Sequence, residues 1–315
     1  MKTESPMQNR RNFIKSSLLG STILAATNSV FAKDKNETTL SILHTNDVHS
    51  HVEPFADDDK KYPGLGGAAA RATILKNIRD SHENILLLDA GDIFQGTPYF
   101  NFFHGDLEID LMNQMRYDAA TIGNHDFDGG IETLAKQITR ANFPFVNCNY
   151  DFTNTPVENK VHKHIIIKKG KVKIGITGCG VELDGLVPDK LYTNTKYLDP
   201  IKCVQEQVDI LKFQKKCHII ICLSHLGYTY DNNKISDIIL AKNTNNIDLI
   251  IGGHTHTFLD KPTEEKNKDE KEVFINQVGW AGLQIGKLDY VFEKSFRKKM
   301  SKHHTVIVSK KSIAN

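Results

Sequence analysis

The chain has 315 residues, of which 39% are hydrophobic, and this is enough for one large domain or two small ones. Lys and Arg total 40 against 38 Asp and Glu, so the net charge of +2 excludes a general attraction to nucleic-acid polymers or acidic membranes. The five cysteines are odd in number and form no CxxC pair, so we expect mostly small buried residues rather than a disulfide framework. A Cys217–Cys222 pair is the less favoured alternative.

The first residues have the pattern of an export signal. Arg10 and Arg11 precede an apolar run over residues 18–26, and Val30 and Ala32 suit a cleavage site that ends at residue 32. The pattern predicts a signal peptide of the twin-arginine type over residues 1–32 and a periplasmic or extracellular location. An uncleaved anchor is the alternative, but the run is short and interrupted by polar residues, so we expect no stable membrane insertion.

Apolar runs typical of strands then alternate with amphipathic stretches typical of helices. Strands are expected at 40–44, 85–89, 119–122, 145–149, 172–177, 218–223 and 248–251. Helices are expected at 67–79, 107–115, 131–141, 201–213 and 235–241. The alternation predicts an α/β fold with largely buried sheets.

The later part of the chain departs from this alternation. Strands at 273–277 and 283–292 have no helix between them, so part of a sheet is expected to be antiparallel, and residues 164–177 are typical of a hairpin. The charged run 261–271 is expected to be a solvated loop. The basic segment 294–315 is expected to be a mobile surface tail with a short strand at 305–308 at most, after a domain spanning residues 33–293.

Five polar clusters follow predicted strands. They are Asn46-Asp47-Val48-His49, Gly91-Asp92, Gly123-Asn124-His125-Asp126-Phe127-Asp128, Ser224-His225 and Gly252-Gly253-His254-Thr255-His256. Ligands of open α/β sheets bind beyond the carboxyl ends of the strands, so we expect all five clusters at one edge. Each cluster alone is more typical of a turn or a surface histidine, but that explanation does not account for five of them at strand ends.

The clusters together offer carboxylate, imidazole and amide ligands without any thiolate. This mixture suits borderline divalent metals such as Zn, Mn or Fe and argues against a structural zinc site. Asp47 and His49 alternate, as do His254 and His256, so in extended backbone each pair would point to one side. Asp92 has two oxygens and could bridge two cations.

These motifs resemble those of the calcineurin-like metallophosphoesterase superfamily, and the Leu-His-Thr-Asn-Asp opening is most similar to its 5′-nucleotidase branch. The resemblance covers roughly residues 40–292. It implies a four-layer α/β/β/α sandwich of two mixed sheets and two divalent metal ions. By motif position, one metal would be held by Asp47, His49 and His256 and the other by Asn124, His225 and His254, with Asp92 bridging them.

The resemblance further implies that His125 is catalytic and that Asp128 orients it, while Asp126 serves structure. Two close metals can lower the pKa of a shared water, and the resulting metal-bound hydroxide would attack phosphorus. His125 could stabilise the phosphoryl charge or protonate the leaving oxygen. Two further residues are left open: His51 could touch substrate or form a hydrogen bond at the rim, and Arg71 could meet phosphate or support its helix.

The resemblance leaves the substrate open. Full-length members of the branch carry a C-terminal domain that supplies substrate-binding arginines and aromatic rings, and no such segment follows here. The domain could therefore act alone on small phosphate esters, with nucleotides as the expected class, or a separate polypeptide could supply the missing part. A phosphodiesterase or pyrophosphatase acting on cyclic nucleotides or nucleotide sugars is the alternative activity. A metal-binding subunit without turnover is the third hypothesis, which the His125–Asp128 pair disfavours.

Overall fold

The computed structural model describes residues 37–313, in which the apolar runs of the sequence form two mixed β-sheets. The first sheet has the order β13-β12-β1-β2-β3. Its strands are β1 (Thr38–Thr45), β2 (Ile85–Asp89), β3 (Ala119–Ala120), β12 (Gln284–Phe292) and β13 (Lys298–Ile307). β1 and β2 are parallel, whereas β12 is antiparallel to both β1 and β13. The sheet is therefore mixed, as the sequence predicts.

The second sheet has the order β10-β11-β9-β8-β6-β5. Its strands are β5 (His164–Lys169), β6 (Val172–Gly180), β8 (Ile219–His225), β9 (Leu249–Gly252), β10 (Thr263–Lys266) and β11 (Glu272–Asn276). The four central strands are parallel, and the edge strands β5 and β10 are antiparallel to their neighbours. β5 and β6 confirm the predicted hairpin. Strands β4 (Tyr150–Asp151) and β7 (Lys196–Tyr197) form a separate small pair.

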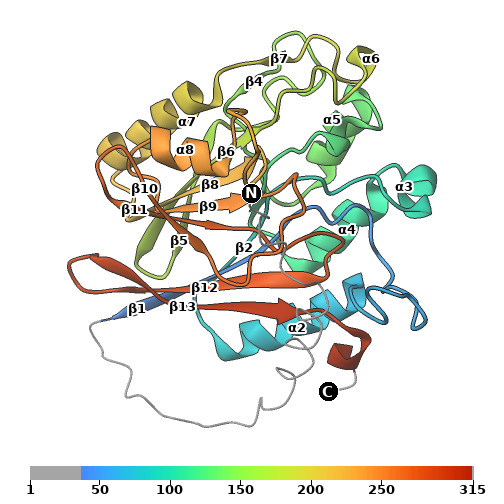
Figure 1. Cartoon of the computed structure of the whole chain (residues 1–315), viewed down its shortest axis with the longest axis horizontal. Helices are drawn as coiled ribbons and strands as arrows, with labels where there is room; N and C mark the ends of the chain where they lie inside the picture. Colours follow the sequence, from blue (N-terminus) through green and yellow to red (C-terminus); the bar gives the residue numbers. More distant parts are fainter. Residues whose placement is uncertain (1–36, 314–315) are drawn as a thin grey trace, which may run out of the picture. The chain divides into compact units, whose positions relative to one another are not determined.

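Helices cover the outer faces of the two sheets (Figure 1). The helices are α2 (Ala68–Ser81), α3 (Pro98–Phe103), α4 (Asp106–Met115), α5 (Ile131–Arg140), α6 (Asp189–Tyr192), α7 (Pro200–Asp209) and α8 (Asp237–Asn243). Short 3-10 turns are η1 (His125–Phe127) and η3 (Lys310–Ile313), and the π-helical turn η2 (Ile210–Gln214) continues α7. All five predicted helices are present, with their ends shifted by a few residues.

Alternating side chains of the strands separate the core into three apolar layers. Ile42 and Leu88 of the first sheet pack with Ile221 of the second between the sheets. Leu43 points to the opposite face and packs with helices α2, α4 and α5, while Ile220 points outward to α7 and α8. Successive strand residues face opposite sides of a sheet, so one apolar run serves two layers. The result is the predicted α/β/β/α sandwich.

Three expectations about individual segments are wrong. Residues 145–149 form isolated bridges rather than a strand, because the backbone of Val146 bonds to Ala120 while that of Asn147 bonds to His162. The charged run 261–271 contains β10, which pairs with β11 as an exposed edge. The segment from residue 294 contains the ten-residue strand β13, which pairs along β12, so it belongs to the sheet instead of forming a surface tail. Charged side chains are compatible with an edge strand because they face solvent.

The predicted signal peptide lies outside the described residues. Within residues 37–313, no helix combines the length and the apolar composition needed to cross a membrane. The five cysteines carry free thiols, four of them buried, which confirms their interpretation as small core residues. Strands β1, β2, β3, β8 and β9 are parallel within their sheets, and the five polar clusters follow their carboxyl ends.

Candidate metal centre

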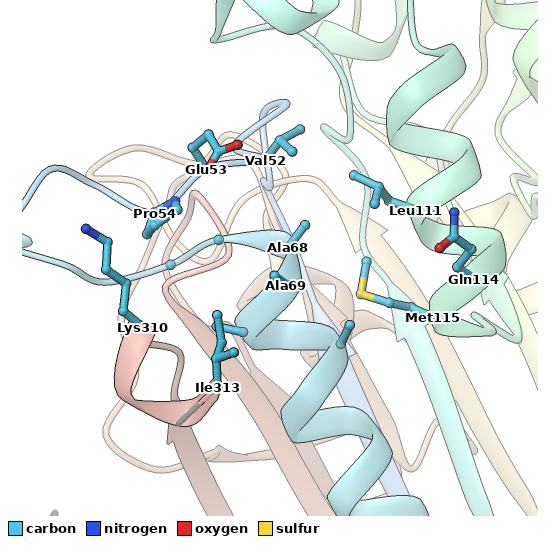
Figure 2. A pocket seen from close by; sticks show the side chains of 14 residues that line it. Val52, Glu53, Pro54, Ala68, Ala69, Leu111, Gln114, Met115, Lys310 and Ile313 are labelled. Carbon is cyan, nitrogen blue, oxygen red and sulfur yellow. The ribbon is translucent and has the colours of Figure 1, made fainter. Parts of the chain in front are cut away.

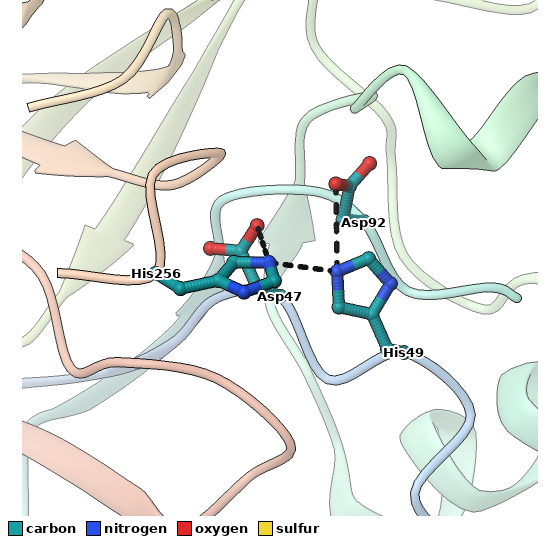
Figure 3. Close-up of side chains that lie close together, drawn as sticks. All are labelled: Asp47, His49, Asp92 and His256. Atoms are coloured by element: carbon teal, nitrogen blue, oxygen red, sulfur yellow. Dashed lines mark hydrogen bonds and ion pairs between the residues drawn. The ribbon is translucent and has the colours of Figure 1, made fainter. Parts of the chain in front are cut away.

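The loops after β1 and β2 of the first sheet and after β9 of the second bring four side chains together at the carboxyl ends of these strands. One ligand atom from each of Asp47, His49, Asp92 and His256 lies within 4.8 Å of the others. Figure 3 shows the imidazoles of His49 and His256 facing each other, with the carboxylate of Asp47 beside His256 and that of Asp92 beside His49. Their Nε2 atoms are 2.9 Å apart, His256 Nε2 lies 3.5 Å from Asp47, and His49 Nε2 lies 3.6 Å from Asp92. This group matches the first predicted ligand set together with the predicted bridging residue.

A second group shares Asp92 with the first. Its other members are His225, at the end of β8, and His254, after β9. His225 Nε2 lies 3.1 Å from Asp92 Oδ2, and His225 Nδ1 is bonded to the carbonyl of Ala90 at 2.7 Å. His254 Nδ1 and Asn124 Oδ1 are 2.8 Å apart. The structure thus brings all seven predicted ligands to one place, with Asp92 between the two groups.

The backbone at these ligands is left-handed rather than extended. Positive φ angles occur at Asp47 (51°), His49 (50°), Asp92 (56°), His254 (72°) and His256 (51°). The expectation that the two alternating pairs project from extended backbone is therefore wrong. Left-handed backbone is unfavourable for residues with a Cβ atom and concentrates at functional sites, where the surrounding structure maintains it. The tight turns direct these side chains toward one another, whereas a continued strand would carry them away from the site.

A glycine allows the loops to approach this closely. A Cβ atom on Gly123 would lie 2.2 Å from Asp92 Oδ1 and 2.7 Å from His225 Nε2. Any side chain at this position would enter the space between the two ligands. The glycine preceding Asn124 is therefore required by packing against the site itself.

The charges of the second group depend on one another. Burial lowers the pKa of His225, but the neighbouring carboxylate of Asp92 outweighs burial and raises the pKa to about 10. Burial is the largest single influence and raises the pKa of Asp92, but the charge and hydrogen bond of His225 together with the charges of His49 and His125 hold that pKa well below its usual range. Burial and the charge of His225 lower the pKa of His254 to about 4. Without a cation, protonation of His225 offsets part of the negative charge of the buried Asp92 and Asp47 carboxylates.

These residues fit a pair of divalent cations. His225 Nε2 is fully buried and makes no well-formed hydrogen bond among the described residues, although Asp92 lies within ion-pair distance. Two Nε2 atoms that face each other, as in His49 and His256, cannot both donate or both accept. A cation would accept lone pairs from all these atoms at once. The carboxylate, imidazole and amide donors are those that Zn, Mn and Fe share.

The predicted catalytic pair lies beside the ligands on the turn η1. His125 Nδ1 and Asp128 Oδ2 are 2.7 Å apart, and the backbone N–H of His125 donates to Asp92 Oδ1 at 2.8 Å. The hydrogen bond to Asp128 raises the pKa of His125 despite partial burial, and the charge of Asp92 adds to the effect. The side chain of His125 is 40% exposed, and its ring centroid lies 5.2 Å from that of His49. His125 can therefore meet a ligand from solvent.

Asp126 supports the backbone of the site, in the structural role that we expected. Its buried carboxylate accepts the backbone N–H groups of Asp92, Ile93, Phe94 and Gly123 at 2.8–3.1 Å. Burial raises the pKa of Asp126 to about 7, although these bonds oppose the shift. One side chain thus ties the loop after β2 to the loop that carries Asn124.

Sequence reasoning missed the supporting roles of Asn46, Gln277 and Trp280. Asn46 Nδ2 donates to Asp47 Oδ2 at 2.6 Å and to the carbonyl of Gly279 at 2.7 Å. Gln277 donates through Nε2 to the carbonyl of Gly253 at 2.7 Å. Trp280 stacks on His256. The only sequence signal was a single tryptophan that follows a glycine just before a strand.

The two residues left open take structural positions. His51 stacks on Phe55 with ring centroids 5.0 Å apart, and burial lowers its pKa to about 4. Arg71 is buried in α2, and this position favours a role in supporting the helix. Burial lowers the pKa of Arg71, while Tyr117 and Asp89 oppose the shift. A hollow of about 300 Å³ between α2, α4 and η3 has a mainly apolar lining and contains none of the predicted site residues (Figure 2).

A four-layer α/β/β/α sandwich with Asp, His and Asn side chains gathered at one sheet edge defines a metallophosphoesterase. The model of the calcineurin-like phosphoesterase family matches residues 40–258, and the chain belongs to this family. The family resemblance inferred from the motifs is confirmed.

Known relatives extend the similarity beyond the matched region. The chain is 33% identical to the snake venom 5′-nucleotidase of Crotalus adamanteus, over 81% of this chain and 45% of the relative. It is 31% identical to a 5′-nucleotidase of Homo sapiens, over 87% and 50%. The crystal structure of a 5′-nucleotidase precursor from Thermus thermophilus superposes with a TM-score of 0.78 at 30% identity, over 87% of this chain and 55% of that one.

The chain spans about half the length of the curated relatives it matches. The chain thus belongs to a family of metal-dependent phosphoric ester hydrolases that use two divalent metals, as predicted, and its own side chains group for such a site. The role of each side chain and the substrate remain predictions.

Proposed function

We propose that this chain is a phosphomonoesterase acting on nucleotides and similar small phosphate esters. The observation that carries the proposal is the His125–Asp128 pair, which is accessible from solvent and adjoins Asp92. A site that only binds metal needs no such proton donor. The relatives named 5′-nucleotidase support nucleotides as the substrate class.

The proposed ligand sets follow the two groups at the sheet edge. Asp92 belongs to both, and the other members are Asp47, His49 and His256 in one group and Asn124, His225 and His254 in the other. Two bound divalent cations would lower the pKa of a water molecule and neutralise charge on the phosphate oxygens. The chain's own contribution is to fix the positions of these ligands through left-handed turns and through the bonds of Asn46 and Asp126.

His125 then acts on the substrate side of the ligands. Its raised pKa lets the imidazolium persist to a higher pH than in a free histidine, with Nδ1–H donating to Asp128. The other ring nitrogen, Nε2, can donate to a phosphoryl oxygen or give its proton to the leaving oxygen. Asp128 fixes the ring orientation and favours the charged form.

The test compares the full chain with its His125→Ala variant at equal metal content. Release of inorganic phosphate from a nucleoside 5′-monophosphate is measured beside cleavage of bis(p-nitrophenyl) phosphate. We expect the parent to hydrolyse the monoester faster and the variant to lose both activities. Faster cleavage of the diester would replace the proposal with the phosphodiesterase alternative. Absence of both activities in a protein that holds two metals would favour the metal-binding subunit.

We also propose export through the segment 1–32 and a periplasmic or extracellular location. Deletion of residues 1–32 should retain the protein inside the cell, and equal export of the deleted form would refute this. The separate substrate-binding polypeptide stays a prediction. Purification of the native protein as a strict monomer with full nucleotidase activity would count against such a partner.

A further inference from the structure

A loop between β11 and β12 lies against both ends of the first ligand group. The N–H of Gly279 donates to the carbonyl of Thr257 at 2.9 Å, next to His256. Two residues on, the N–H of Ala281 donates to the carbonyl of Asp47 at 2.7 Å. Trp280 lies between these two bonds. The loop therefore links the turn after β1 to the turn after β9, which are more than two hundred residues apart in the sequence.

The indole of Trp280 covers one face of the His256 imidazole. The ring centroids are 5.6 Å apart and the planes differ by only 4°. The indole also meets the rings of His51, Phe55 and Tyr62 at steep angles, with ring centroids 5.2, 6.0 and 6.4 Å away. The tryptophan is thus held on its other sides while its face meets the ligand.

His256 differs from the other histidines of the site in how its ring is held. His225 and His49 each have Nδ1 within hydrogen-bond distance of a backbone carbonyl, whereas Nδ1 of His254 meets Asn124 of its own group. Such bonds normally orient a metal-binding imidazole. Among residues 37–313, His256 Nδ1 has no comparable bond, and its side chain is 39% exposed. Its backbone is left-handed like that of His49 and His254, so the difference lies in the ring contacts alone.

We propose that Trp280 is a positioning residue for the metal centre, which holds the His256 ring in its ligand orientation by stacking. Stacked aromatic rings contribute beyond simple burial, and here the contact replaces the missing hydrogen bond. Because Trp280 is the single tryptophan of the chain, its fluorescence should also report occupancy of the Asp47–His256 half of the site. The inference rests on the proposed metal ligands but not on the substrate.

The experiment titrates Mn²⁺ into the metal-free full chain, with calorimetry for affinity and tryptophan fluorescence as the second signal. The variants are Trp280→Ala, Trp280→Phe and the control Phe55→Ala, which removes a ring from the same aromatic cluster without touching His256. We expect Trp280→Ala to weaken one of two Mn²⁺ sites by about 10–100-fold, as loss of other ligand-orienting groups does. Trp280→Phe retains a stacking ring and should recover most of the affinity. Phe55→Ala removes only one of the three rings that support Trp280, so it should weaken binding far less than Trp280→Ala does.

Fluorescence of the parent should change with only one of the two binding events. That change should disappear in His256→Ala and persist in Asn124→Ala, which alters the other group. Equal Mn²⁺ affinities in the parent and Trp280→Ala would overturn the inference, as would a Phe variant as weak as the Ala variant. If Trp280→Ala does not fold, the Mn²⁺ affinity of Trp280→Phe and the fluorescence change of the parent still test the role of Trp280. A parent that binds no Mn²⁺ would refute the proposed function as well, whereas unchanged affinity in a hydrolytically active protein would refute the role of Trp280 alone.

Discussion

The metal-ligand cluster and the His125–Asp128 pair lie side by side but depend on different things. The cluster is mostly buried, five of its seven residues have left-handed backbone, and its carboxylates raise the pKa of His225. The pair is partly exposed and lies on the ordinary right-handed backbone of a 3-10 turn, and its two side chains are hydrogen-bonded to each other. Bound cations would therefore compensate the buried carboxylates of the cluster, whereas the His125–Asp128 pair is complete within the protein.

Removal of the metals should have the largest effect. Dialysis against a chelator should abolish hydrolysis and destabilise the fold, because a cation bound only to the native state stabilises it by about 2.7 kcal/mol at about 100 times its Kd. Activity and thermal unfolding, each measured before and after re-addition of Zn²⁺ or Mn²⁺, check both effects. Full turnover after verified metal removal would show that hydrolysis does not depend on metal ions in the cluster.

Replacement of His125 by Ala should come next. Loss of a positioned proton donor should lower kcat/KM by about 100–10,000-fold. The two metals should stay bound, because His125 contributes only its backbone N–H to the cluster. Elemental analysis and steady-state kinetics on one preparation separate the two outcomes. Loss of a metal in this variant would show that the two regions are not independent.

The Asp128→Asn substitution should have a smaller effect. Loss of a group that orients a site histidine typically costs about 10–100-fold. Asp128 raises the pKa of His125, so its removal should lower that pKa and deplete the imidazolium at a lower pH. Activity that needs the protonated ring is present below the pKa and lost above it. The alkaline limb of the kcat/KM profile should therefore move to lower pH, and an unshifted limb would refute the role of Asp128.

Ser236→Ala should leave both regions unchanged and serves to calibrate the others. Ser236 caps α8 by accepting the N–H of Ile239. Loss of such a cap typically costs about 1 kcal/mol. Urea unfolding should show this decrease, while activity and metal content per folded molecule should match the parent. A fall in activity would mean that α8 influences the site.

The sequence determined the two apolar faces of the strands and the polar residues that follow them. Ile42 and Leu43 alternate along β1, and this pattern is enough to predict a strand that serves two layers. The prediction of a strand at 145–149 was wrong because the backbone partners of this segment lie in two different parts of the chain. Apolar composition carries no information about such partners. The prediction of a surface tail after residue 294 was wrong for a related reason. The basic side chains indicate exposure to solvent, but the backbone pairs with β12.

The candidate site shows the same division. Types and spacing of side chains within Asn46–His49 or Gly252–His256 predict the ligand chemistry, because short motifs carry chemistry locally. Only the tertiary structure placed Asp92 between two groups of histidines, turned the ligands inward through left-handed backbone, and laid Trp280 on His256. These features arise from contacts between loops far apart in the chain, and a local pattern cannot encode the position of a distant partner.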